Sequence, residues 1–169
     1  GATGEYIRTG LKWDKWLENW EHGMKFQNRR NKILNLDFTI TTAGIWEIEK
    51  MFELSLQYNQ KIITKQTFAF SPEVFMSVRT IPKKILQRIL GEILERIKPR
   101  ATRKQKGMIE QLELLIEQPH YTDLYENWEQ GIKDGKEFID HMEARRNNPV
   151  TMREIMHKDK ELGEWYDSI

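Results

Sequence analysis

Two short runs of hydroxyl-bearing and small residues are the first candidates for a binding site. Thr41-Thr42-Ala43-Gly44 comes after one segment expected to be a strand, and Phe70-Ser71-Pro72-Glu73 comes after another. In open α/β sheets and barrels, ligands bind at the carboxyl ends of parallel strands. Side chains of this size leave room for a ligand and can hydrogen-bond to it. Strands also end in Thr, Ser and Gly simply to turn, so the position alone leaves both interpretations open.

Several kinds of chemistry are excluded by the residues that the sequence lacks. It has no cysteine, which rules out disulfides, thiol catalysis and iron–sulfur ligation within these 169 residues. The four histidines (His22, His120, His141 and His157) show no metal-ligand spacing such as HExxH and are interpreted as surface or satisfied core residues. There is no GxSxG motif, phosphate-binding glycine loop or carboxylate cluster. We therefore assign no catalytic residue and no metal ligand.

The charge and hydropathy of the chain limit its partners. Lys and Arg number 27 and Asp and Glu 26, which gives a net charge of +1, and 38% of the residues are hydrophobic. Such a balance provides no electrostatic footprint for duplex nucleic acid or an anionic membrane. No apolar run approaches the roughly 18–20 residues needed to span a bilayer, and no signal peptide is recognisable at the start. We expect a cytoplasmic globular protein that binds neither nucleic acid nor membrane.

A period of two predicts a strand over residues 33–42. Its apolar positions are Leu34, Leu36, Phe38 and Ile40, and Asn35, Asp37, Thr39 and Thr41 alternate with them. A parallel strand buried on both faces would be almost continuously apolar, so one face of this strand meets water or a polar ligand. With a helix over 44–58 and a second strand over 62–70, the order is that of a βαβ unit. We expect its two strands to be adjacent and parallel.

Helical spacing dominates the rest of the chain. Residues 11–26 place Trp13, Trp16, Leu17, Trp20 and Met24 on one face. Three tryptophans on one stripe also suit a stacking platform, but core packing is the preferred interpretation because the opposite face has ordinary polar residues. Further apolar stripes predict helices over about 82–97, 108–116 and 121–146, and short turns near 152–156 and 162–166. The basic segment 100–106 is interpreted as a solvated connector.

The motifs, taken in order, resemble the C-terminal half of a radical S-adenosylmethionine (radical SAM) enzyme of the twitch-domain subfamily. Residues 5–10 (EYIRTG) and 13–16 (WDKW) are similar to the segment after that family's fourth barrel strand. Residues 38–48 (FTITTAGIWEI) resemble its fifth strand and the next loop, and 67–82 resemble its sixth strand and the proline-containing stretch after it. The tail, from Gly135 to Tyr166, resembles the closing helices. The family's CxxxCxxC loop and first four strands are missing.

This resemblance implies an α/β fold. Residues 1–98 would form the C-terminal half of a partial (β/α)6 barrel, and 99–169 a helical, twitch-like extension. In the complete enzyme, a [4Fe–4S] cluster would reductively cleave S-adenosylmethionine to a 5′-deoxyadenosyl radical, which abstracts hydrogen from a substrate. The cofactor-binding residues expected here are Arg8, Thr39, Thr41, Thr42 and Ser71. For Arg8 we expect bidentate pairing with the methionyl carboxylate, with an ordinary ion pair to Glu5 or Asp14 as the alternative.

The absence of cysteine makes a partner necessary under this interpretation. The chain alone is expected to bind no cofactor or cluster and to be inactive, so an N-terminal half must supply the cluster, either in cis or as a separate chain. An unpaired strand edge and an apolar helix flank would also favour a homodimer. The alternative is a non-catalytic helical binding or scaffold protein that has kept the fold and lost the chemistry. A CxxxCxxC-bearing reading frame upstream of Gly1 would decide for the enzyme.

Overall fold

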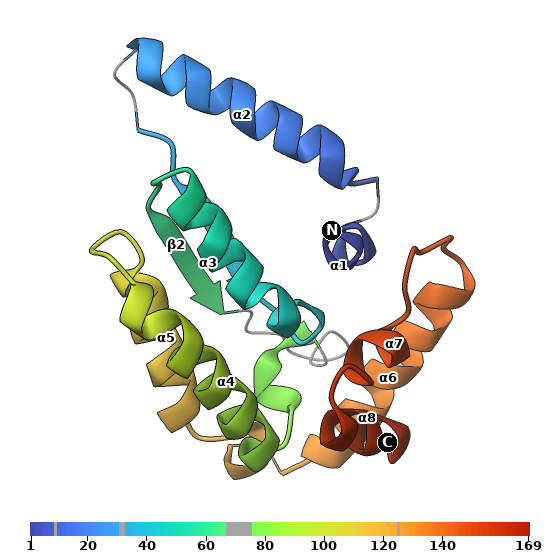
Figure 1. Cartoon of the computed structure of the whole chain (residues 1–169). Coiled ribbons are helices and arrows are strands. Elements are labelled where there is room, and N and C mark those ends of the chain that lie inside the picture. Colours follow the sequence, from blue (N-terminus) through green and yellow to red (C-terminus); the bar gives the residue numbers. More distant parts are fainter. Residues whose placement is uncertain (9, 31–32, 67–75, 125) are drawn as a thin grey trace.

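The computed structural model describes residues 1–8, 10–30, 33–66, 76–124 and 126–169 (Figure 1). Its helices are α1 (Ala2–Ile7), α2 (Trp13–Arg30), α3 (Ile48–Gln57), α4 (Lys83–Ile97), α5 (Lys106–Glu117), α6 (Trp128–Ala144), α7 (Met152–Met156) and α8 (Lys160–Asp167). Short 3-10 helices are η1 (Ala43–Glu47), η3 (Val78–Thr80), η4 (Lys98–Arg100) and η5 (Tyr121–Asp123), and the strands are β1 (Leu36–Ile40) and β2 (Ile62–Gln66). No helix in these ranges is long and apolar enough to cross a membrane.

The two strands form the parallel pair that the sequence predicts. Their register runs from Leu36 opposite Ile62 to Ile40 opposite Gln66, and η1 with α3 makes the crossover between them. Along β1, Leu36 and Ile40 are buried whereas Asp37 and Thr39 are exposed. The expected βαβ unit and its polar strand face are therefore confirmed. The expected end of the second strand, at 67–70, lies outside the described residues.

The expectation of half a (β/α)6 barrel is wrong. Within the described ranges most residues are helical, and β1 and β2 make a sheet of two strands. A two-stranded sheet is too narrow to curve toward closure. The long apolar stripes after residue 80 instead form helices that pack on the sheet and on one another. The fold is mainly helical and is built around one parallel strand pair.

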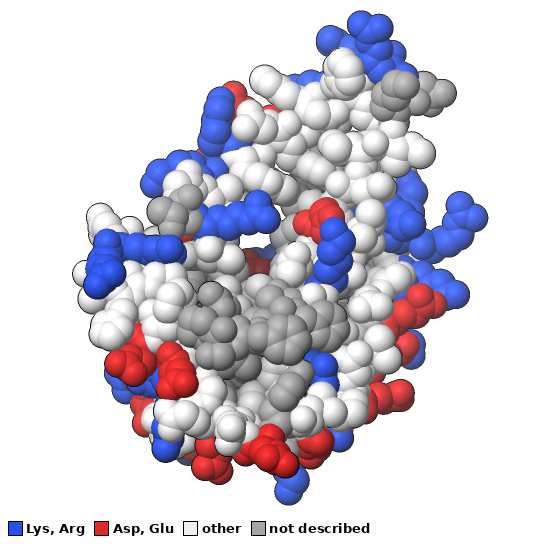
Figure 2. All heavy atoms as spheres, turned by 180° about the vertical axis from the view of Figure 1, so that it is seen from behind, with Lys and Arg blue, Asp and Glu red and all other residues white. Residues whose placement is uncertain are grey.

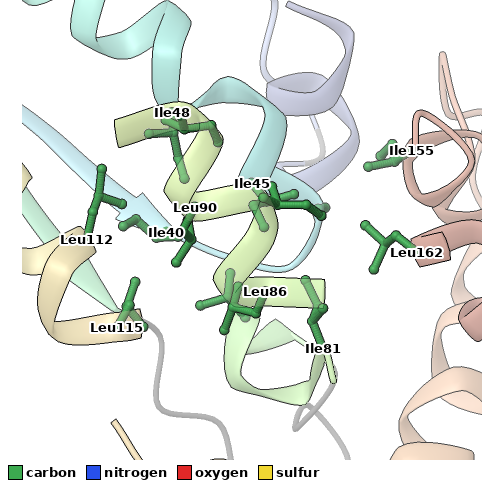
Figure 3. Packing of buried hydrophobic residues seen from close by; sticks show 14 of the residues in the cluster. Ile40, Ile45, Ile48, Ile81, Leu86, Leu90, Leu112, Leu115, Ile155 and Leu162 are labelled. Carbon is green, nitrogen blue, oxygen red and sulfur yellow. The ribbon is translucent and has the colours of Figure 1, made fainter. Parts of the chain in front are cut away.

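The core is one hydrophobic cluster that reaches from α1 to α8. Figure 3 shows its centre, where Ile40 of β1, residues of η1 and α3, Leu90 of α4 and Leu112 of α5 converge. Ile155 and Leu162 extend it into α7 and α8. Each large aliphatic side chain fully buried here stabilises the fold by about 1.5–3 kcal/mol. The cluster crosses residue 98, and the expected division into 1–98 and 99–169 stays a prediction.

Side-chain caps explain why the last two helices begin where they do. Thr151 and Glu154 form a capping box at the start of α7, and Asp159 accepts the Leu162 N–H at the start of α8. The Trp46 indole N–H donates to the Ile155 carbonyl at 2.9 Å and ties η1 to α7. Both short C-terminal helices are confirmed as predicted.

The helix predicted over 121–146 begins later than expected. Only the turn η5 forms at Tyr121, where the Asp123 carboxylate accepts the backbone N–H of His120. The Trp128 ring then packs edge-on against the rings of His120 and Tyr121, and α6 starts at Trp128 itself. His120 is buried, with its Nε2 2.7 Å from the Ile81 carbonyl oxygen, as expected of a satisfied core histidine.

Gly163 and Gly91 provide a matched test of the packing between α7 and α8. A Cβ at Gly163 would lie 3.1 Å from the His157 Cα, whereas a Cβ at Gly91 would meet nothing within 4 Å. We expect Gly163→Ala to lower the free energy of unfolding by roughly 1–3 kcal/mol. Gly91→Ala should raise it by about 0.5–1 kcal/mol, because alanine favours a helix interior. Urea denaturation measures both changes, and a neutral Gly163→Ala would contradict this close packing.

Candidate functional site

A cavity of about 600 Å³ lies between α1, α2, β1 and η1. Figure 2 shows this face of the molecule hollowed below α2, with basic side chains at the border of the hollow. The volume falls within the range of roughly 300–1,000 Å³ that is typical of small-molecule sites. Three of the five expected cofactor-binding residues line it, namely Arg8, Thr39 and Thr41.

Arg8 brings to this cavity a guanidinium that has no ion partner among the residues the structure describes. It comes after α1 in an extended conformation and is exposed. The Glu5 carboxylate accepts the Trp13 N–H at 2.9 Å, and Arg8 has no ion pair with Glu5, Asp14 or any other described residue. An exposed guanidinium that forms no ion pair with a described residue can pair bidentately with a carboxylate or phosphate.

Thr39 and Thr41 present hydroxyls on the same side of the cavity. Thr39 is exposed on the polar face of β1. Thr41 is buried, and its Oγ1 accepts the Gly44 N–H at 3.0 Å, which fixes the turn into η1. A Cβ at Gly44 would lie 2.9 Å from that same oxygen, so glycine is required for this close approach. The Thr41 hydroxyl keeps its proton available for a ligand.

Two further charged residues line the cavity and were not identified from the sequence. Lys65 of β2 lies opposite Thr39 and donates to the Asp37 carboxylate at 2.6 Å. Glu47 of η1 accepts hydrogen bonds from Thr3 and Lys50 at 2.9 and 3.0 Å. Burial opposes ionisation of Glu47, but these two hydrogen bonds together with the positive charge of Lys50 hold its pKa below the usual value. Lys65 lies within the predicted second strand, opposite the predicted polar face of the first, whereas nothing in the sequence indicated Glu47.

The tryptophan stripe of α2 divides between the core and the cavity. Trp20 is buried, as core packing predicts, and its ring stands edge-on to Tyr58. Trp13 and Trp16 are half-buried and line the cavity. Their rings stack at a centroid distance of 5.0 Å with an interplanar angle of 12°. The wall opposite β1 is thus apolar and aromatic.

Of the other two expected residues, Thr42 does not line this cavity and Ser71 lies outside the described residues. Thr42 is fully buried, and its hydroxyl donates to the Ser77 carbonyl at 2.8 Å. The Thr80 hydroxyl donates to the same carbonyl at 2.7 Å, and the Tyr121 hydroxyl donates to Ser77 Oγ at 3.1 Å. This network anchors the carboxyl end of β1. A cofactor role for either residue stays a prediction.

The residues that line the cavity are chemically compatible with a carboxylate ligand and include no ligand for an iron–sulfur cluster. The Arg8 guanidinium, which has no ion partner among the described residues, can bind a carboxylate, the two hydroxyls can hydrogen-bond to polar groups, and the indole wall can pack against an apolar or aromatic group. No cysteine exists in the sequence to ligate a cluster. In the ranges the structure describes, no group of three or more His, Cys, Asp or Glu could hold a metal ion.

Comparisons with family models, with curated proteins and with solved structures found no match to this chain. They bear neither on the resemblance to radical SAM enzymes nor on the scaffold alternative. The cavity and its residues are therefore the basis for assigning a function to the chain.

The hydroxyl network at the end of β1 gives a direct test of Thr42. Thr42→Val keeps the shape of the side chain and removes a buried donor, so we expect the free energy of unfolding to fall by about 1–2 kcal/mol. Thr39→Val on the exposed face is the matched control and should stay within about 0.5 kcal/mol of the parent. Urea denaturation compares the two. Equal effects would mean that the Thr42 hydroxyl has no structural role.

Proposed function

We propose that this chain is the C-terminal part of a radical SAM enzyme and forms the wall of the site that binds the methionyl end of S-adenosylmethionine. The observation that carries the proposal is the meeting of Arg8, Thr39 and Thr41 at one cavity. Arg8 is separated from the two threonines by the whole of α2, so their convergence is a property of the fold. The motif resemblance assigns these same residues to the cofactor.

Each residue that lines the cavity has a proposed role in binding S-adenosylmethionine. The Arg8 guanidinium binds the carboxylate, since no described acidic residue competes for it. The hydroxyls of Thr39 and Thr41 orient the polar groups beside it. Trp13, Trp16 and their apolar neighbours exclude water from the opposite side. When bound at a reduced cluster, S-adenosylmethionine supplies the hydrogen-abstracting chemistry.

The cluster belongs to another part of the complete protein. Because this chain has no thiolate, the ligands come from an N-terminal half, joined in cis or carried on a separate chain. The chain alone is inactive under this proposal. The cytoplasm is the proposed compartment, because its reducing conditions keep thiolate ligands available.

The alternative, a non-catalytic binding or scaffold protein, explains the residues of the cavity less well. A non-catalytic binding protein could use the same cavity for another ligand, but it would not account for the motif resemblance. The resemblance and the cavity instead agree on the same three residues, which is why the enzyme is preferred.

The complete polypeptide, reconstituted with iron and sulfide under anaerobic conditions, tests the proposal. With dithionite it should release 5′-deoxyadenosine from S-adenosylmethionine, detected by liquid chromatography. The chain 1–169 alone, treated in the same way, should show no cluster absorbance and release none. A complete polypeptide that holds a cluster and still cleaves no S-adenosylmethionine would refute the proposed function.

Arg8 is the residue whose replacement is most informative. In the reconstituted complete polypeptide, Arg8→Lys should weaken S-adenosylmethionine binding by roughly 1–3 kcal/mol, and Arg8→Ala at least as much, because the bidentate fork is lost. Arg103→Ala is the matched control, since Arg103 is exposed and lies away from the cavity lining. Isothermal titration calorimetry measures the affinities. An unchanged affinity in Arg8→Ala would leave Arg8 with a structural role only.

A further inference from the structure

The two halves of α2 are held to the rest of the molecule to very different extents. Its two buried residues, Trp20 and Met24, both lie in the second half. There the hydroxyl of Tyr58, at the end of α3, donates to the Glu21 carboxylate at 3.0 Å, and the Tyr58 ring stands edge-on to Trp20. The stretch 13–19 has no buried residue. The second half therefore anchors α2, and the first half is only lightly held.

The lightly held half of α2 is preceded by a joint that can absorb a tilt of the helix. Gly10, three residues before α2, has a φ of +85°, and a Cβ at this position would meet nothing within 4 Å. The backbone conformation, and not packing, is therefore what favours glycine here. On the other side of the joint α1 is fixed, since Tyr6 is buried and the Thr3 hydroxyl donates to Glu47 of η1 at 2.9 Å. A left-handed glycine between a fixed and a lightly held helix is suited to be a hinge.

The cavity separates an aromatic surface from a charged one. Trp13 and Trp16 line it from the first half of α2 and are half-buried. The strands contribute Asp37 and Lys65, whose ion pair of 2.6 Å leaves 52% and 59% of the two side chains exposed. Burial of the indoles would be favourable, but moving them onto the strands would strip water from the ion pair at a larger cost. The charged surface thus keeps α2 away from the strands until a ligand takes the place of that water.

We propose that the first half of α2 is a lid, which closes over the cavity when a ligand replaces the water on the strand surface. Trp13 lies seven residues before Trp20, which is about 10 Å along the helix. A tilt of roughly 30° about the anchored half therefore moves Trp13 by roughly 5 Å. The lid concerns the same cavity as the proposed function, but it does not depend on which ligand binds there.

The contacts of the lid explain why a ligand would shift its position. A ligand shifts an equilibrium between two states only by its preference for one of them. In the open state, a ligand reaches Arg8 and the strand surface, and in the closed state it also gains the rings of Trp13 and Trp16. The Trp13 N–H donates to the Glu5 carboxylate at 2.9 Å and ties the lid to α1 in the open state. Closure would also exclude water from the cavity.

Removal of the charges on the strands tests the lid without any ligand. Asp37→Leu with Lys65→Met leaves no ion pair to dehydrate, so the lid should close by itself. The chain has no cysteine of its own, so spin labels on Asp14→Cys in α2 and Glu92→Cys in α4 report one distance by double electron–electron resonance. Because α4 packs on the apolar face of β1 (Figure 3), this distance should shorten by roughly 4 Å. Tryptophan emission should shift to shorter wavelengths in the same variant.

The matched control is a second surface ion pair, between η4 and α5. Lys98 and Glu113 are 2.6 Å apart, are similarly exposed and lie away from the cavity lining, so Lys98→Met with Glu113→Leu should keep the parent distance. Equal shortening in this control would overturn the proposal. Asp37→Thr with Lys65→Thr removes the same charges with a residue that strands favour, and it should shorten the distance as well. An unchanged distance in either folded strand variant would also overturn the lid.

The tryptophans provide the last arm of the experiment. Adding Trp13→Ala and Trp16→Ala to the charge-free variant should restore the open distance, because the apolar surface that drives closure is lost. A distance that stays short would overturn the proposal. All of these measurements use the chain 1–169 without ligand, so the lid and the proposed function are tested separately. Closure, together with a complete polypeptide that does not cleave S-adenosylmethionine, would support the lid and reject the enzyme, and cleavage without closure would do the reverse.

Discussion

The parallel pairing of β1 with β2 is the constraint on which the rest of the structure depends. Two parallel strands cannot be joined by a tight turn, so the chain must leave the end of β1, cross over and return to the start of β2. The crossover places η1 and α3 against the apolar positions of the strands. α4 and α5 then close the core around Ile40 and its neighbours (Figure 3). The polar face of β1 and one of its edges remain outside that core.

The same constraint determines where binding groups are found. At the carboxyl end of β1, Thr41 must turn the chain into η1, and its side-chain oxygen does so by accepting the Gly44 N–H. The hydroxyl of Thr42, the next residue, is fully buried and donates to the Ser77 carbonyl. Adjacent residues of the same type therefore have opposite environments, one beside the cavity and one in the core. That difference arises at the turn into η1, because β1 ends at Ile40 and Thr42 already has helical backbone dihedrals.

The sequence predicted local structure well because periodicity reports directly on burial. The alternation over 33–42 led to β1, and the apolar stripe after Pro82 led to α4. It predicted the larger architecture wrongly, because a βαβ unit is compatible with many sheets and the number of strands is a tertiary property. Thr41 and Thr42 could not be separated, because their difference depends on the distant Ser77. Glu47 was missed for a related reason: Thr3, one of its two hydrogen-bond donors, lies 44 residues earlier in the chain.

The hydrogen bond from the Trp46 indole to the Ile155 carbonyl joins groups 109 residues apart. During synthesis the chain emerges from its N-terminal end, so η1 exists long before its partner on α7. One boundary of the cavity is η1, which cannot pack against α7 until residue 155 has been synthesised. Contacts of such long range are also those that slow folding most. Loss of α7 would remove this hydrogen-bond acceptor and so act on η1, which borders the cavity, from more than a hundred residues away.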